Sequence, residues 1–154
     1  MFGHDVSVGH LLTWRTYGSW LPGDVRGWKP RREGFQSENR PLENYSQEHL
    51  RFDPVWLNRN QRQIIAETIV SHCRFRDWFC SAVTCQSNHV HVVLITTLAP
   101  RGAMARLKAR CTRVLRRHSG NSPIRKLWAD RGSVTKLLDE RDYSNAVNYV
   151  LRHE

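Results

Sequence analysis

The clearest indication of the fold of this 154-residue chain comes from residues 78–97. They read Trp-Phe-Cys-Ser-Ala-Val-Thr-Cys-Gln-Ser-Asn-His-Val-His-Val-Val-Leu-Ile-Thr-Thr. The stretch is rich in β-branched and aromatic residues, which predicts two strands, about 78–86 and 90–97. The polar turn Gln86-Ser87-Asn88 joins them and predicts a β-hairpin. The unbroken apolar run Val92-Val93-Leu94-Ile95 indicates a strand that is covered on both faces.

Two histidines, His89 and His91, flank Val90 where the second strand begins. Side chains alternate across a strand, so both imidazoles leave the same face and converge on one point. Two ordinary histidines on a solvated strand would give the same pattern. The apolar residues that follow favour a covered strand, in which two imidazoles need partners. We therefore predict a metal site built on this strand.

Strands and helices alternate along the rest of the chain. We expect a first strand at 10–17, a helix at 59–74, a second helix at 101–118, a fourth strand at 133–138 and a last helix from about 139 to the end. With the hairpin, the order is βαββαβα. It predicts an α+β fold, a ferredoxin-like antiparallel sheet flanked by helices with an extra C-terminal helix. The length suits one domain, 1–154.

Residues 19–58 form a long insertion between the first strand and the first helix. Proline and glycine punctuate it, so we expect irregular structure, and an irregular stretch of this length is more often functional than a passive connector. Its tryptophans Trp20, Trp28 and Trp56 could stack on unpaired bases or cap the sheet.

The chain carries a net charge of +10. This balance indicates a polyanionic partner, with nucleic acid as the first candidate and an anionic membrane surface as the second. In the helix at 101–118, one sector is apolar, whereas another carries Arg106, Arg110, Arg113 and Arg117. No acidic residue lies between 101 and 117, which favours a phosphate track over a merely solvated face.

The four cysteines, Cys73, Cys80, Cys85 and Cys111, contain no C-x-x-C pair and are interpreted as buried reduced thiols. Cys80 and Cys85 have opposite strand parity, so we expect them to face opposite ways. The sequence has no run of the roughly 18 apolar residues that a membrane span needs, and the N-terminus lacks signal-peptide features. We expect a cytoplasmic protein.

The predicted last helix has an apolar stripe made of Tyr143, Ala146, Val147, Val150 and Leu151. Tyr143 is therefore interpreted as a core residue. Tyr149 and His153 lie off this stripe, four residues apart on one flank, with Asn145 one turn earlier. Simple packing would explain them. Combined with the histidine pair, His153 could complete a set of three nitrogen ligands and bring the Tyr149 hydroxyl to the metal.

These features together resemble the single-tyrosine HUH transposases of the insertion-sequence 200-like family, which includes the REP-associated tyrosine transposases. His89-Val90-His91 matches the histidine, hydrophobic, histidine motif that gives HUH its name. The basic helix, the Tyr149 helix and the stretches 14–18 and 20–24 extend the resemblance over nearly the whole chain. The third ligand in well-known members is often glutamine, whereas the matching position here is His153.

The resemblance implies a DNA transposase in which His89, His91 and His153 hold Mg²⁺ or Mn²⁺. We expect Tyr149 to attack single-stranded DNA that has hairpin ends, and to leave a 5′-phosphotyrosine and a free 3′-hydroxyl. DNA contacts would come from Arg15, Trp20, Arg106, Arg110, Arg113 and Arg117. Some relatives act as homodimers and others as monomers, so the oligomeric state of this protein stays open.

Three other functions stay open. An HUH replication or mobilisation nickase would share the chemistry but act at an origin. A metal-dependent hydrolase would use activated water and form no covalent adduct. A non-catalytic nucleic-acid-binding module of ferredoxin-like fold would bind DNA and leave the histidine pair without a task.

Overall fold

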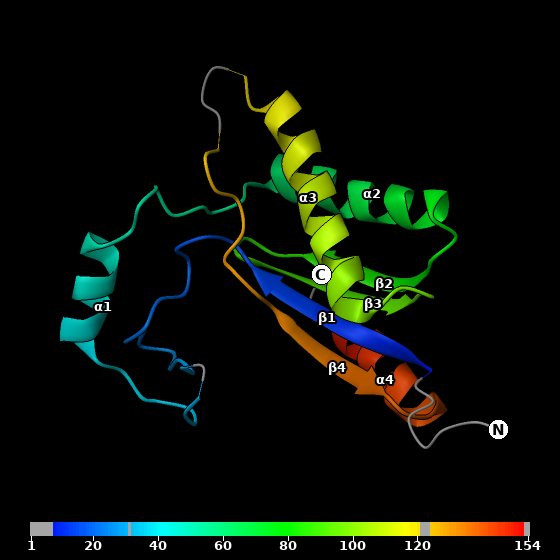
Figure 1. Ribbon diagram of the computed structural model, residues 1–154, viewed down its shortest axis with the longest axis horizontal. Coiled ribbons are helices and arrows are strands. Elements are labelled where there is room, and N and C mark those ends of the chain that lie inside the picture. The colour runs from blue at the N-terminus through cyan, green and yellow to red at the C-terminus, as the bar shows by residue number, and fades with distance from the viewer. Residues whose placement is uncertain (1–7, 31, 121–123, 153–154) are drawn as a thin grey trace.

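The computed structural model describes residues 8–30, 32–120 and 124–152. Within them the chain forms four strands and four helices, as Figure 1 shows. In chain order these are β1 Gly9–Arg15, α1 Arg40–Glu48, α2 Arg59–Phe75, β2 Phe79–Cys85, β3 His89–Ile95, α3 Pro100–His118, β4 Ser133–Leu137 and α4 Glu140–Leu151.

The four strands form one sheet in the order β2-β3-β1-β4, and every neighbouring pair is antiparallel. The predicted ferredoxin-like α+β fold with an extra C-terminal helix is thus confirmed. The register that matters for the site runs across its centre: Thr13 of β1 pairs with His91 of β3, and Arg15 pairs with His89.

Helices cover both faces of the sheet. Figure 1 shows α2 and α3 on one side and α4 on the other. Even-numbered residues of β1 and β3 enter the larger core beneath α2 and α3, namely Leu12, Trp14, Val90, Val92 and Leu94. Val93 instead enters a smaller core with Ala146 and Val150 of α4. The expectation that β3 is covered on both faces is confirmed, and strand alternation places His89 and His91 on the α4 face.

The insertion at 19–58 is not irregular throughout, because it contains α1. The side chain of Asn39 caps this helix by accepting a hydrogen bond from the Leu42 amide at 3.1 Å. Pro41 lies in the first turn, where a helix tolerates proline because the amide has no partner there. The prediction of irregular structure, made from the prolines and glycines of 19–58, is therefore wrong for the nine residues of α1. No residue of α1 is buried, so the helix adds nothing to either core.

Two further expectations were wrong. Cys80 and Cys85 both pack against the larger core, because the pairing of β2 with β3 shifts between Cys80 and Ala82 and this irregularity changes the strand parity. Leu151, assigned to the apolar stripe, is 48% exposed at the end of α4. Among the described residues, no helix is long and apolar enough to cross a membrane.

Candidate active site

His89 and His91 lie side by side on the α4 face of the sheet. Their ring centroids are 4.7 Å apart and the rings are nearly perpendicular. His91 is buried at 6% exposure, whereas His89 is half-buried at the start of the strand. The convergence predicted from strand alternation is therefore present in the fold.

Each imidazole makes a hydrogen bond through its Nδ1 atom. Nδ1 of His89 donates to Oδ1 of Asn88 at 2.8 Å, since an amide oxygen can only accept. Nδ1 of His91 lies 2.7 Å from the Thr13 hydroxyl on β1. A ring that donates from Nδ1 carries its lone pair on Nε2, the arrangement that partners of metal-binding histidines commonly impose. No local sequence pattern predicts this role of Thr13, because only the β1–β3 register brings it to His91.

Tyr149 of α4 contacts His91, one member of the histidine pair. Its ring centroid is 5.3 Å from that of His91, with an interplanar angle of 72°. Buried Ala146 and Val150 hold α4 against the sheet and turn Tyr149, which is 46% exposed, toward the strand. Tyr149 and His91 line an open groove of ≈490 Å³ together with Thr13 and Asn145. The phenol is thus close to one imidazole and accessible from solvent.

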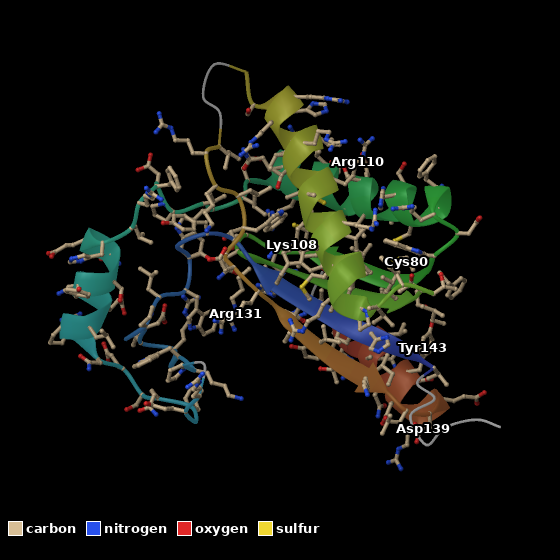
Figure 2. All side chains as sticks on the ribbon, in the orientation of Figure 1. Cys80, Lys108, Arg110, Arg131, Asp139 and Tyr143 are labelled. Atoms are coloured by element: carbon tan, nitrogen blue, oxygen red, sulfur yellow. The ribbon has the colours of Figure 1, made fainter. Side chains whose placement is uncertain are left out.

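Tyr143, the other phenol of α4, lies far from the histidines. A methyl group at Gly9 would come within 3.4 Å of its Cε2 and within 3.3 Å of Ile95. Ile95 is four residues beyond His91, or about 13 Å along the strand. Figure 2 shows Tyr143 and Arg131 at opposite ends of the sheet, and the histidines lie at the Arg131 end. Tyr143 packs on the smaller core, as predicted.

A metal ion would find two of its three predicted ligands here. His153 lies outside the described residues. In the ranges that the structure describes, no three His, Cys, Asp or Glu side chains gather as a metal-binding group. The two converging imidazoles, with Nδ1 of each engaged by a neighbour, fit a divalent cation as neutral nitrogen ligands.

Arg15 and Trp20 meet beside this site. Cζ of Arg15 lies 4.1 Å from the centroid of the Trp20 ring, and Cζ of Arg26 lies 3.7 Å from it. Asp24 pairs with Arg26 at 2.6 Å. Arg15 and Trp20 were predicted as DNA contacts, whereas Asp24 and Arg26 were not, because only the folded loop brings them to the Trp20 ring.

The arginines of α3 lie away from the histidine pair. Arg106, Arg113 and Arg117 are exposed and Arg110 is half-buried. Because α3 covers the opposite face of the sheet, these four residues do not join His89, His91 and Tyr149. Arg110, labelled in Figure 2, and Arg113 line a groove of ≈820 Å³ between α2 and α3. His72 of this groove has a lowered pKa because of burial and the charges of Arg76, Arg110 and Arg106.

The fold and site define a ferredoxin-like domain with a histidine pair and a tyrosine helix on one face. No protein-family model matches the chain, and no curated protein matches it by sequence. Among solved structures it is similar to a REP-associated tyrosine transposase bound to a REP hairpin, with a TM-score of 0.54 and 14% identity. The match covers 99% of this chain and 73% of that chain. At this identity, the likeness shows a distant relation at the level of the fold.

Tyr143→Phe should make the protein less sensitive to alkali. Burial raises the pKa of Tyr143 above its ordinary value of about 10. The unfolded chain therefore ionises this phenol first, so its contribution to stability is present below pH 10 and is lost as the pH rises above it. Urea unfolding at pH 9 and pH 11 should show a smaller loss of stability for Tyr143→Phe than for the parent. Equal losses would contradict the burial of this phenol.

Proposed function

We propose that this protein is a transposase that cleaves and rejoins single-stranded DNA, with Tyr149 as nucleophile and His89 and His91 as ligands of a divalent metal ion. The observation that carries the proposal is the contact between the Tyr149 and His91 rings on one face of the sheet. The likeness in fold to a REP-associated tyrosine transposase supports it. The positive charge of the chain suits a DNA partner.

His89 and His91 would hold Mg²⁺ or Mn²⁺, with His153 as the proposed third ligand. The cation, when bound, would supply Lewis-acid polarisation of a phosphate oxygen. Imidazole ligands suit manganese better than magnesium, which prefers oxygen. Thr13 and Asn88 would keep both rings oriented through their Nδ1 atoms.

Tyr149 would attack the scissile phosphorus as its phenolate. A bond forms between the tyrosine oxygen and phosphorus, and the bond from phosphorus to O3′ breaks. The phenol proton leaves to solvent and O3′ takes up a proton, so the products are a 5′-phosphotyrosine and a free 3′-hydroxyl. The 5′-phosphotyrosine is itself a phosphodiester, so a 3′-hydroxyl can attack its phosphorus, release Tyr149 and rejoin the strands. Because Tyr149 contacts His91 of its own chain, we propose that it acts in cis.

Tyr149→Phe and His89→Ala should each abolish covalent protein–DNA adducts. The first variant lacks the nucleophile and the second lacks a metal ligand. The test incubates each protein with Mn²⁺ and labelled single-stranded DNA that carries the inverted repeats flanking the gene, and then runs a denaturing gel. Tyr143→Phe is the matched control and should retain the adduct, because its phenol lies at the other end of the sheet.

Other outcomes of this experiment identify other functions. Cleavage without an adduct would mean a hydrolase that activates water. Binding without cleavage by any variant would mean a DNA-binding module. An adduct that forms only on an origin sequence would mean a nickase. Loss of the adduct in Tyr143→Phe but not in Tyr149→Phe would show that we have assigned the wrong phenol.

Thr13→Val should weaken metal binding about 10- to 100-fold, the usual cost of removing an outer partner of a ligand histidine. Valine keeps the shape of threonine but cannot hydrogen-bond Nδ1 of His91. Calorimetric titration with Mn²⁺ measures the affinity. Thr135→Val is the matched control, because Thr135 pairs with Leu11 rather than facing a histidine across the sheet. Equal affinities for Thr13→Val and the parent would contradict the assignment of His91.

We propose that the arginines of α3 bind the phosphate backbone of DNA on the far side of the sheet. Arg113→Ala should lower affinity for all sequences alike and reduce the slope of log affinity against log salt by about 0.7, the value for one phosphate contact on single-stranded DNA. Fluorescence anisotropy over a salt series measures the slope. Arg59→Ala, an exposed arginine at the start of α2, is the control. An unchanged slope in Arg113→Ala would contradict the track.

A further inference from the structure

Arg15 is the last residue of β1 and lies directly opposite His89. Strand alternation puts it on the same face as Thr13, whose hydroxyl reaches His91. Residues directly opposite each other in an antiparallel pair have Cβ atoms about 5 Å apart. The Arg15 side chain therefore leaves the sheet next to His89. It starts two residues, or about 7 Å, along the strand from the level at which Tyr149 contacts His91.

A short loop supports the guanidinium of Arg15. The indole ring of Trp20 lies 4.1 Å from Cζ of Arg15, and its N–H donates to the Gly27 carbonyl at 2.6 Å. Arg26 contacts the same ring, and its guanidinium donates two hydrogen bonds to the Asp24 carboxylate, of 2.8 and 2.6 Å. Nη2 of Arg26 also donates to the Ser19 carbonyl at 2.9 Å. The loop thus fixes the ring on which Arg15 rests.

The charges of this group do not balance. Asp24 neutralises Arg26, and the hydrogen bonds from Arg26 lower the pKa of Asp24. In the part of the chain that the structure describes, no carboxylate forms an ion pair with Arg15. Burial and the charge of Arg26 both lower the pKa of Arg15, more than Asp24 raises it. Within the described residues, one positive charge of this group therefore has no carboxylate partner and is available to an external anion.

The chemistry of a stacked guanidinium indicates which anion fits. A guanidinium that rests on an aromatic ring by its face keeps its N–H donors at its edge. Those donors match the paired oxygens of a phosphate group.

The position of Arg15 indicates which phosphate of the DNA backbone it would bind. In phosphoryl transfer, the attacking and leaving oxygens lie roughly in line on opposite sides of phosphorus. Arg15 starts at the level of His89, two residues away from the level at which Tyr149 contacts His91, and so lies toward the leaving strand.

We propose that Arg15 binds the backbone phosphate on the 5′ side of the scissile phosphate, and that Trp20 positions it there. The inference rests on the proposed function and deepens it, because it assigns a site for the strand that departs with the 3′-hydroxyl. Holding that strand after cleavage would keep its 3′-hydroxyl close to the phosphotyrosine for rejoining.

The test is a cycle of protein and substrate changes. Wild-type protein first locates the cleavage position on the repeat-bearing oligonucleotide. A second oligonucleotide then replaces the phosphate on the 5′ side with a neutral methylphosphonate. We expect Arg15→Ala to lower kcat/KM for adduct formation about 10- to 100-fold on normal DNA, the range for a hydrogen bond to a charged group. On the neutral substrate the wild type should fall by a similar factor, and Arg15→Ala should fall no further.

Three more variants sharpen the test. Arg15→Lys keeps the charge but loses the planar edge, so it should show a partial loss with the same dependence on the substrate charge. Trp20→Leu should behave likewise, because it removes only the support. Arg141→Ala, an exposed arginine of α4 near Tyr143 and away from His89, should match the wild type on both substrates. Thermal unfolding of each variant verifies that it is folded.

Two results would overturn the assignment of Arg15. One is an adduct rate in Arg15→Ala equal to that of wild type. The other is that Arg15→Ala loses the same factor in kcat/KM on the neutral substrate as on normal DNA. The two effects would then be independent, which means that Arg15 and this phosphate do not touch. Failure of the proposed function has a different signature, which is that the wild type forms no adduct on any substrate.

Discussion

The antiparallel pairing of β1 with β3 is the constraint on which the rest of the site depends. It aligns Thr13 with His91 and Arg15 with His89, so one face of two neighbouring strands carries both imidazoles, a hydroxyl and a guanidinium. The larger core fixes this register. A slip of one residue would turn Trp14 and Val92 from the core toward α4 and would expose large apolar surfaces. The burial that stabilises the fold therefore also orients the groups that we assign to chemistry.

The second requirement is the docking of α4. Asp139 caps the helix by accepting from the Asp142 amide at 2.8 Å, and Ala146 and Val150 bury its apolar side. Small side chains let the helix lie close to β3, and Tyr149 then contacts His91 while it keeps nearly half of its surface open. A nucleophile has to meet both conditions. Tyr143 is held instead in the smaller core and meets neither.

Positive charge is distributed over both faces of the sheet. The α3 arginines lie on one face, and Arg15 lies with the histidines on the other. A DNA strand at the histidines would therefore not reach the α3 track without passing around an edge of the sheet. In the function that we propose, the two basic surfaces therefore bind different parts of the DNA.

Features of the fold and the site that depend on local sequence patterns could be predicted from the sequence alone. The hairpin, the shared face of His89 and His91, the basic sector of α3 and the position of Tyr149 off the apolar stripe all follow from periods of two or about 3.6 residues. Contacts between segments that are distant in the chain are visible only in the folded structure. The β1–β3 register brought Thr13 to His91, the loop brought Arg26 to Trp20, and the irregular pairing of β2 with β3 placed Cys80 and Cys85 on one side. Periodicity fixes the direction of a side chain within its own element, but contacts between elements depend on register and packing, which no local pattern contains.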